Sequence, residues 1–448
     1  MLIKNTRELA TTALREQALA IIEAGIRSVL PGTVMKSSLS YNPLGRILKV
    51  KDTEYNAAKG RIFVIGGGKA AGLMSKALED IIGSDNITAG IVNCKDGDYR
   101  TNRIKVIKAS HPFPDSRGLK GVERMLALKE KYSINGHDLV ICLISGGGSA
   151  LMPCPVEGIS LGDKQKITEL LLKCGAEIHE INAVRKHLSK IKGGRLGKFY
   201  SPAKVISLII SDVVGDDLDV IASGPTFPDS STFKDAYGVL EKYDLLAKAP
   251  ESIVAYLEKG FRGEVAETPK ELANCENHIV GNNRLALEAM AKKAQEQGLS
   301  PSIVTSEQKG DTVEVARTRA AEIMEGKYAG YTALLIGGET TPTLPGNAGR
   351  GGRNQHYAAV SLLAMKKYPG KWLVASVGTD GSDYLPDAAG AMVDNSTLDR
   401  AVAHGLDVQA YIDRYDSYGL FQELGKSLIV TGNTGTNVSD IMLYLLWQ

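Results

Sequence analysis

The chain has 448 residues, of which 43% are hydrophobic and 23% charged, and its formal net charge is +2. This length and composition predict a globular protein of two or three domains, and the near-zero charge argues against nucleic acid or an anionic membrane as a partner. Glycine is in excess, with 48 residues where an average usage of about 7% would give roughly 31. The positions of these glycines are therefore the main clue to the site.

The cysteines and the N-terminal segment indicate a cytoplasmic protein. The five cysteines are an odd number and form no C-x-x-C motif, which argues against a disulfide framework and against a cysteine zinc site. No apolar run approaches the ~18 residues of a membrane-spanning helix. Glu8, Glu16 and Glu23 argue against a transit peptide.

The first predicted element is an amphipathic helix between Ala10 and Val29, where apolar residues recur at three- and four-residue spacing. From Arg61 onward, short apolar runs end in glycine or polar clusters and helical patterns follow. Such runs predict strands of parallel or mixed sheets covered by helices, with ligands at the carboxyl ends of the strands. We predict an α/β fold of two domains, at 1–240 and 276–448, joined by a helical or loop connection at 241–275.

The run Gly-Gly-Gly-Lys-Ala-Ala at 66–71 follows the first of these strands. A glycine turn there lets an anion approach backbone N–H groups, and Lys69 adds a full positive charge. The alternative is a tight turn with a solvated lysine. The run also fits G-x-G-x-x-A, but Asn93-Cys94-Lys95 stands where a dinucleotide site needs an acidic residue.

The run Ser-Gly-Gly-Gly-Ser-Ala at 145–150 follows another buried strand. Its three glycines form a ready set of backbone N–H donors, and Ser149 is expected to contact a phosphate or to cap a helix. A nucleophilic serine is the alternative, but Leu151 stands where G-x-S-x-G requires glycine.

A basic segment follows at 185–195, with six basic or histidine side chains in eleven residues. Arg185, Ser189 and Lys192 have helical spacing, which predicts one anion-facing helix surface; a solvated charged helix is the alternative.

Acidic clusters follow two later strands, around Asp212 and Asp216 and around Asp380. Carboxylates at strand ends suit Mg²⁺ coordination or a general base, although Asp–Gly pairs also occur in plain turns. Between these clusters, Arg350 and Arg353 lie among glycines, as expected of side chains that clamp a carboxylate or phosphate.

These motifs resemble the type II glycerate 2-kinases, which carry a C-terminal MOFRL domain. The resemblance rests on Gly-Gly-Gly-Lys-Ala at 66–70, Leu-Ile-Ser-Gly-Gly-Gly-Ser-Ala at 143–150, Asn-x-Val-Arg-Lys-His-Leu-Ser-x-Ile-Lys-Gly-Gly-Arg-Leu at 182–196, Ile-Ser-Asp-Val-x-Gly-Asp at 210–216, the block 337–354, Gly-Thr-Asp-Gly at 378–381 and Thr-Gly-x-Thr-Gly-Thr-Asn at 431–437. It implies phosphoryl transfer from ATP, with Mg²⁺, to the 2-hydroxyl of glycerate in a cleft between two α/β domains. The partners are then ATP and a small hydroxy acid, and a homo-oligomer stays open.

Residue roles follow from this resemblance together with the chemistry above. The catalytic residues are expected to be Lys69, Arg353 and Asp212. The nucleotide-binding residues are expected to be Gly67, Gly68, Gly146, Gly147, Gly148, Ser149 and Lys192. The substrate-binding residues are expected to be Arg185, Arg350, Glu339 and Asn354, and the metal ligands Asp212, Asp216 and Asp380.

Two departures from the family pattern bear on the substrate. Tyr384-Leu385-Pro386 interrupts an Asp-Gly-Pro-Thr-Asp pattern, and His356 replaces a glutamate. Another sugar acid therefore stays open as the substrate. A hydroxypyruvate reductase, a serine hydrolase and a non-catalytic sugar-acid binding protein are the competing functions.

Overall fold

The computed structural model describes residues 2–95 and 99–447. The chain forms two compact units, which are described separately below. Unit 1 comprises Met1–Thr33 and Gly281–Gln448, and unit 2 comprises Val34–Val280. The α/β class predicted from the alternation of apolar runs and helical patterns is confirmed in both units.

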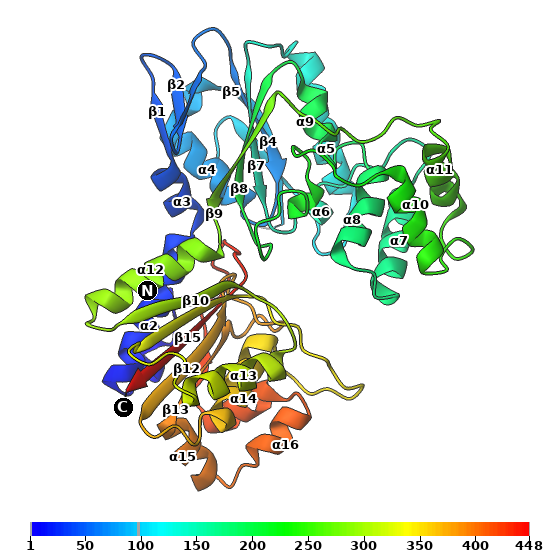
Figure 1. Cartoon of the computed structure of the whole chain (residues 1–448). Helices are drawn as coiled ribbons and strands as arrows, with labels where there is room; N and C mark the ends of the chain where they lie inside the picture. Colours follow the sequence, from blue (N-terminus) through cyan, green and yellow to red (C-terminus); the bar gives the residue numbers. More distant parts are fainter. Residues whose placement is uncertain (1, 96–98, 448) are drawn as a thin grey trace. The chain divides into compact units, whose positions relative to one another are not determined.

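Unit 2 is built on a six-stranded sheet (Figure 1). In spatial order its strands are β6 (Ile104–Lys108), β5 (Ile87–Cys94), β4 (Ile62–Gly67), β7 (Leu139–Ser145), β8 (Lys204–Ile210) and β9 (Cys275–Gly281). The five strands from β6 to β8 are parallel to their neighbours, so their carboxyl ends lie at one edge. The continuous burial of β4 and β7 explains why both read as unbroken apolar runs.

Helices cover both faces of this sheet. On one face lies α4 (Ala71–Ile82), and on the other lie α5 (Ser116–Lys131) and α9 (Arg195–Tyr200) (Figure 1). Two short helical turns, α6 (Gly148–Leu151) and η2 (Ile221–Ser223), contact each other at the strand ends, and η1 (Ser84–Asn86) follows α4. A small antiparallel sheet of β1 (Leu39–Asn42), β2 (Ile47–Val50) and β3 (Thr53–Asn56) completes this part.

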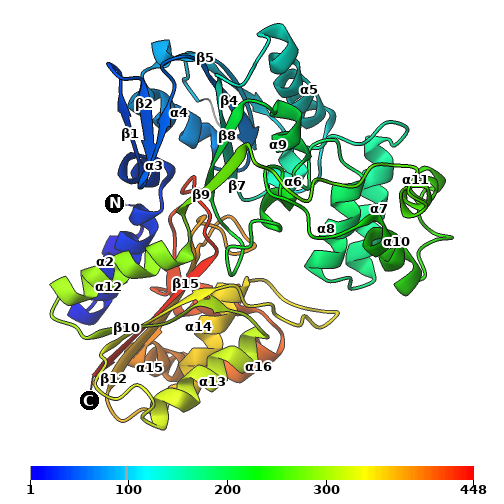
Figure 2. The same ribbon diagram turned by 45° about the horizontal axis from the view of Figure 1, so that its top comes forward.

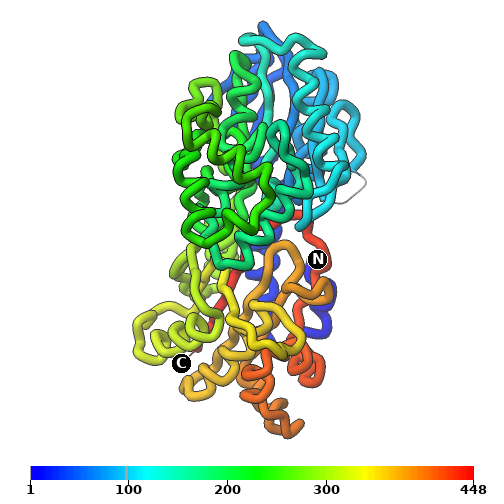
Figure 3. The backbone as a smooth tube through the Cα atoms, turned by 90° about the vertical axis from the view of Figure 1, so that its right-hand side faces the viewer, coloured from blue at the N-terminus to red at the C-terminus, as the bar shows by residue number. Residues whose placement is uncertain are grey.

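A layer of four helices with its own apolar core lies beside the sheet within unit 2. It consists of α7 (Leu161–Lys173), α8 (Ile178–His187), α10 (Phe233–Lys242) and α11 (Glu251–Phe261). Figure 3 views unit 2 from the side of this layer. Side chains cap α7 and α10 at their N-termini, where Ser160 and Thr232 each accept from a backbone N–H three residues on.

Unit 1 has a mixed six-stranded sheet. In spatial order its strands are β10 (Pro301–Gln308), β11 (Ala333–Gly338), β15 (Asp440–Trp447), β12 (Lys371–Gly378), β13 (Gly390–Asp394) and β14 (Leu428–Ile429). Only β10 and β11 pair in parallel, and the other neighbours are antiparallel.

Helices also cover both faces of this second sheet. On one face lie α2 (Ala13–Ser28) and α12 (Asn283–Glu296), and on the other lie α13 (Thr312–Met324), α14 (Arg353–Ala364) and α15 (Asn395–Ala403) (Figure 2). Unit 1 also contains α1 (Thr6–Leu9), α16 (Val408–Asp413) and α17 (Ser417–Leu424), whereas α3 (Pro31–Ser38) starts in unit 1 and ends in unit 2.

The unit to which the N-terminal helix belongs differs from the prediction. The prediction placed residues 1–240 in one domain, but α2 packs on α12 and β15 of unit 1, and buried Arg15 pairs with Asp394 at 2.6 Å. Nor is 241–275 a mere connection, since α11 belongs to the core of the four-helix layer and β9 starts at Cys275. An apolar helix face predicts burial but does not tell which sheet will cover it.

The described residues include no single helix long and apolar enough to cross a membrane. Only the bent pair formed by α2 and α3 passes on length and composition.

Candidate functional site

The two glycine loops of unit 2 lie side by side at the ends of β4 and β7. Three hydrogen bonds join the turn after β4 to its surroundings: the N–H groups of Gly68, Lys69 and Ala70 donate to Asn93 O at 3.1 Å, Gly146 O at 2.8 Å and Ser145 Oγ at 3.0 Å. This turn therefore has internal acceptors for the amides that the sequence predicted would bind phosphate.

The glycines of the first turn are explained by close packing. A Cβ on Gly66 would lie 2.0 Å from the Leu143 carbonyl oxygen, and one on Gly67 would lie 2.7 Å from Met152 Cγ. A Cβ on Gly68 would lie 2.1 Å from Ser145 Oγ. These residues let two strand ends approach each other, which is a structural use of glycine.

The loop after β7 has a different hydrogen-bond pattern. In the described part of the chain no backbone carbonyl accepts from the N–H groups of Gly146, Gly147, Gly148 or Ser149. Gly147 has the left-handed φ of 76°, which turns the backbone sharply before α6. Successive donors in such a turn form a concavity that suits a phosphate group.

Three charged or titratable side chains surround this loop. A Cβ on Gly146 would lie 2.0 Å from Asp212 Oδ2, so the carboxylate at the end of β8 lies directly against the loop. A Cβ on Gly147 would lie 2.8 Å from the His111 ring and 3.3 Å from Lys69 Cγ. Burial, together with Lys69 and Lys95, lowers the pKa of His111 to about 4, so the ring is neutral near pH 7.

Ser149 belongs to a partly buried chain of polar side chains. Its hydroxyl lies 2.7 Å from Ser223 Oγ, which donates to Asn182 Oδ1 at 3.1 Å. Ala222 and Ser223 have positive φ values of 52° and 61°, an uncommon conformation that the surroundings must hold. Within the described residues Ser149 has no hydrogen-bonded base, which a nucleophilic serine requires.

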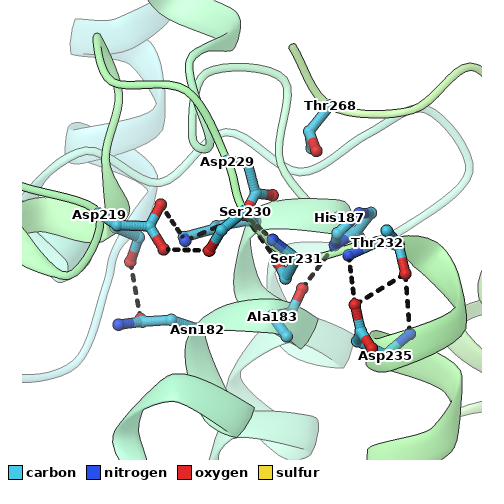
Figure 4. A network of polar contacts seen from close by, with 12 residues as sticks. Asn182, Ala183, His187, Asp219, Asp229, Ser230, Ser231, Thr232, Asp235 and Thr268 are labelled. Carbon is cyan, nitrogen blue, oxygen red and sulfur yellow. Dashed lines mark hydrogen bonds and ion pairs between the residues drawn. The ribbon is translucent and has the colours of Figure 1, made fainter. Parts of the chain in front are cut away.

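Helix α8 is anchored by a buried network that Figure 4 shows. Lys186 is 2% exposed and pairs with Asp219 at 2.5 Å and Asp229 at 3.1 Å. His187 of the same helix contacts Ala183 O at 2.7 Å through Nδ1. These contacts fix the helix that carries Asn182 and Arg185.

The predicted helical face of Arg185, Ser189 and Lys192 is not formed. Helix α8 ends at His187, Ser189 forms a bridge with Pro155, and Gly193 and Gly194 have left-handed φ values of 55° and 77°. Arg185 and Lys192 nevertheless line one cavity of about 600 Å³ together with Lys164 of α7. Burial, with Lys164 and Arg185 nearby, holds the pKa of Lys192 well below its usual value.

In unit 1 the predicted catalytic arginine is held by carboxylates. Arg353, the first residue of α14, donates to Asp440 at 2.6 and 3.1 Å and to Glu339 at 2.5 Å. Burial lowers the pKa of Arg353, but Asp440 and Glu339 outweigh it, and the net shift is upward. Glu339 is therefore a partner of Arg353.

Asn354 is 1% exposed and its amide is fully used. Nδ2 donates to Asp383 and Asp440, and Oδ1 accepts from Ser376 at 2.6 Å. This geometry positions Arg353 and its carboxylates and leaves the amide no atom for a substrate. The buried carboxyl of Asp383 accepts from the first amides of α14, and burial raises its pKa to about 6.

Arg350 and Asp380 occupy loops at the strand ends of unit 1. The exposed Arg350 guanidinium lies 4.7 Å from the centre of the Tyr418 ring. Asp380 follows β12 and accepts from Ser382 N at 3.0 Å.

In unit 2, Asp216 lies four residues after Asp212 and has a left-handed φ of 56°.

Several residues of these clusters escaped the sequence analysis. His111 carried no motif, although it follows β6 and precedes proline. Lys164 lies on a helix whose charged residues are typical of a solvated surface. Asp440 starts an otherwise apolar strand, and that isolated carboxylate was the available signal.

The two sheets with helices on their faces define an α/β protein with glycine loops at its strand ends. Residues 17–258 match a domain of unknown function, DUF4147, and residues 332–440 match the MOFRL family. A glycerate 2-kinase of Pyrococcus horikoshii is 40% identical over 96% of this chain and 98% of its own length. The chain therefore belongs to the glycerate kinase family that combines DUF4147 and MOFRL domains, which confirms the resemblance carried by the motifs.

Two further relatives add detail. A crystal structure of a glycerate kinase from Thermotoga maritima has a TM-score of 0.85 at 38% identity and covers 97% of this chain and 100% of that chain. A protein of Agrobacterium vitis with the provisional name of a hydroxypyruvate reductase is 40% identical over 87% of this chain and 88% of its own length.

Proposed function

We propose that this chain transfers the γ-phosphoryl group of ATP to the 2-hydroxyl of glycerate. The single observation that carries the proposal is the loop after β7, where the N–H groups at 146–149 donate to no backbone carbonyl of the described residues and lie beside Lys69 and Asp212. Phosphoryl transfer needs mainly positioning and charge neutralisation, which backbone donors and a lysine supply.

Each of these groups takes a distinct part in the proposed reaction. The N–H groups of Gly146–Ser149 bind phosphate oxygens, and the Lys69 ammonium neutralises the transferred group. Asp212 or Asp380 accepts the proton of the attacking hydroxyl. Arg353, already paired with Asp440 and Glu339, gives up part of that pairing to a phosphate when substrates bind. Arg350 or Arg185 holds the glycerate carboxylate bidentately.

The residues predicted to bind magnesium fit a site completed by phosphates. Within the described residues no three His, Cys, Asp or Glu side chains form a group that could hold a metal ion. In phosphoryl-transfer sites Mg²⁺ uses one or two carboxylates plus phosphates and water. Asp212 fits as such a carboxylate, with Asp216 and Asp380 as further candidates, and bound Mg²⁺ would neutralise phosphate charge.

Neither departure from the family pattern adds a charged side chain that would bind a larger acid, since burial lowers the pKa of His356 to about 4 and Tyr384 carries a phenol. The His356 ring is 2% exposed and stacks on Tyr415 with centroids 4.1 Å apart, so it fills the interior. Tyr384 is 88% exposed. Glycerate therefore stays our proposed substrate.

A hydroxypyruvate reductase is the second candidate, because one relative carries that provisional name. The turn after β4 speaks against it, since the amides that would bind a dinucleotide pyrophosphate already donate to Asn93, Gly146 and Ser145. Asn93 also occupies the position of the acidic ribose ligand, and its buried amide donates to Gly118 O and Leu151 O.

The test is ADP release with D-glycerate and ATP, with the product identified by ³¹P NMR. Lys69→Ala should abolish turnover and leave the far-ultraviolet spectrum and melting temperature unchanged. Lys76→Ala, an exposed lysine of α4, is the matched control and should keep full activity. Wild-type activity in Lys69→Ala would overturn the proposal, and NADH-dependent reduction of hydroxypyruvate would favour the reductase.

A further inference from the structure

The cavity that contains Lys164 concentrates positive charge. Lys164, Arg185 and Lys192 all line it. Among residues 2–95 and 99–447, none of the three pairs with a carboxylate, and the one acidic lining residue, Glu169, is bonded to Lys173 at 2.6 Å. A cluster of this kind needs an anion to balance it.

Lys164 is the strongest indication that the anion is a ligand. The residue is 8% exposed, and its Nζ is buried with no hydrogen-bond partner. An ammonium group in that condition loses its hydration and gains nothing in return, at a cost of several kcal/mol. Burial, with Arg185 and Arg195 nearby, lowers its pKa to about 8. Proteins keep such costs mainly where a ligand repays them.

The rest of the cavity indicates the shape of that ligand. Phe113 and Leu172 line it and are 72% and 61% exposed, an unusual condition for large apolar side chains. The volume of about 600 Å³ lies within the roughly 300–1,000 Å³ of cofactor sites. A three-carbon acid has no apolar body to cover these side chains, whereas a nucleotide has a flat base and a phosphate chain.

The cavity also continues to the proposed transfer site. Gly147 and Ser149 of the loop after β7 line it, and Lys69 and Asp212 lie against that loop. A phosphate chain that starts at Lys164 can therefore reach the loop that carries Gly147 and Ser149.

We infer that this cavity is the nucleotide site, with the base against Phe113 and Leu172 and the phosphates on Lys164, Lys192 and Arg185. The inference rests on the proposed kinase function and deepens it. Lys164 is then a nucleotide-binding residue that no sequence motif predicted. Arg185 is reassigned from the glycerate carboxylate to the nucleotide, which leaves Arg350 for the carboxylate.

Calorimetric titration with ADP, tripolyphosphate and adenosine tests the inference on the full chain. Lys164→Met should weaken ADP and tripolyphosphate at least tenfold. Phe113→Ala should weaken ADP and adenosine several-fold and leave tripolyphosphate unchanged. Lys166→Met changes an exposed lysine of the same helix outside the cavity and should change none of the three.

Three results would overturn the inference: no binding of ADP to the wild-type chain, unchanged ADP affinity in Lys164→Met, or an increase in the KM for glycerate alone in that variant. The last would assign the cavity to the acid. Failure of the proposed function is separable, because Lys164-dependent ADP binding without phosphorylation of glycerate would sustain the nucleotide site and refute the kinase.

Discussion

The two glycine loops of unit 2 have nearly the same sequence and lie against each other, but their backbone donors differ. After β4, the amides of Gly68, Lys69 and Ala70 all have acceptors within the protein. After β7, no backbone carbonyl within the described residues accepts from the amides of 146–149. Glycine therefore marks close packing in both loops, and the loops differ in whether their amides donate to backbone carbonyls of the described residues.

The largest effect is expected when a methyl group is added to the first loop, which tests whether its glycines are required for close packing. Gly66→Ala places a Cβ 2.0 Å from the Leu143 carbonyl oxygen at a residue whose φ is 131°. Because both obstacles are backbone, we expect a loss of about 4 kcal/mol or more in the free energy of unfolding. Urea denaturation followed by circular dichroism measures the loss.

Gly238→Ala serves as the control for this experiment. Gly238 lies on α10 with open space around its Cβ position, so alanine should stabilise the helix by up to about 1 kcal/mol. A Gly66→Ala protein with a wild-type unfolding midpoint would show that the first loop can accommodate a Cβ. Close packing would then not explain why glycine occupies this position.

The same substitution in the second loop should affect activity and largely spare the fold. In Gly146→Ala the new Cβ meets the end of the Asp212 side chain at 2.0 Å, and a side chain can rotate away. We expect stability to change by less than about 1 kcal/mol and kcat to fall on the order of 100-fold, because the carboxylate leaves its place.

Steady-state kinetics and thermal melting measure both effects for Gly146→Ala. If kcat stays at the wild-type value while the protein melts normally, Asp212 has no part in the reaction. If the protein instead unfolds, the two loops do not differ in the way proposed.

Sequence reasoning could find both loops but not the difference between them. Apolar runs ending in glycine predict strand ends, because a buried parallel strand has few other patterns. The hydrogen-bond partners of Gly68 and Lys69 lie 25 and 77 residues away, in β5 and in the loop after β7, and no local pattern encodes them. The predicted family was confirmed because the motifs were many and in order.

Charged side chains were harder to interpret than glycines. Arg353 was predicted to clamp a ligand but is paired with Asp440 and Glu339. Lys164 attracted no prediction, yet it is buried and its Nζ has no hydrogen-bond partner among the described residues. Charge type is visible in a sequence, whereas burial and pairing depend on packing between distant elements. The domain boundary failed for the same reason, since α2 joins unit 1 through contacts with α12.

Lys164 is a side-chain donor that has no hydrogen-bond acceptor among the described residues, so it extends the comparison of the two loops to a side chain. Replacement of this buried lysine by methionine keeps its volume and removes its charge. A pKa of about 8 instead of 10.5, at about 1.4 kcal/mol per pKa unit, means that the charged form costs about 3 kcal/mol at pH 7. We expect Lys164→Met to stabilise the ligand-free protein by about 1–3 kcal/mol while it weakens nucleotide binding.

Thermal melting without and with ADP separates the two effects of Lys164→Met. Lys166→Met, with an exposed side chain, should leave stability within about 0.5 kcal/mol of wild type. Destabilisation of the ligand-free protein by Lys164→Met would mean that the ammonium has a stabilising partner and that its burial is structural.

The smallest effect expected is the dependence of this difference on pH. The pKa of Lys164 is about 8 in the folded protein and 10.5 in the unfolded chain, so between these values the unfolded state binds more protons and stability rises with pH. The burial penalty is fully present below pH 8 and is relieved as the pH approaches 10.5. Lys192, whose pKa is lowered in the same cavity, shifts stability in the same direction in both proteins.

The stability difference between Lys164→Met and the wild type should therefore shrink from pH 7 to pH 10, by at most about 1.4 kcal/mol per pH unit. Chemical denaturation at four pH values measures it. A difference that stays constant would show that Lys164 keeps its proton throughout this pH range. The ammonium group would then have a stabilising partner, and the cavity would not resemble the loop after β7.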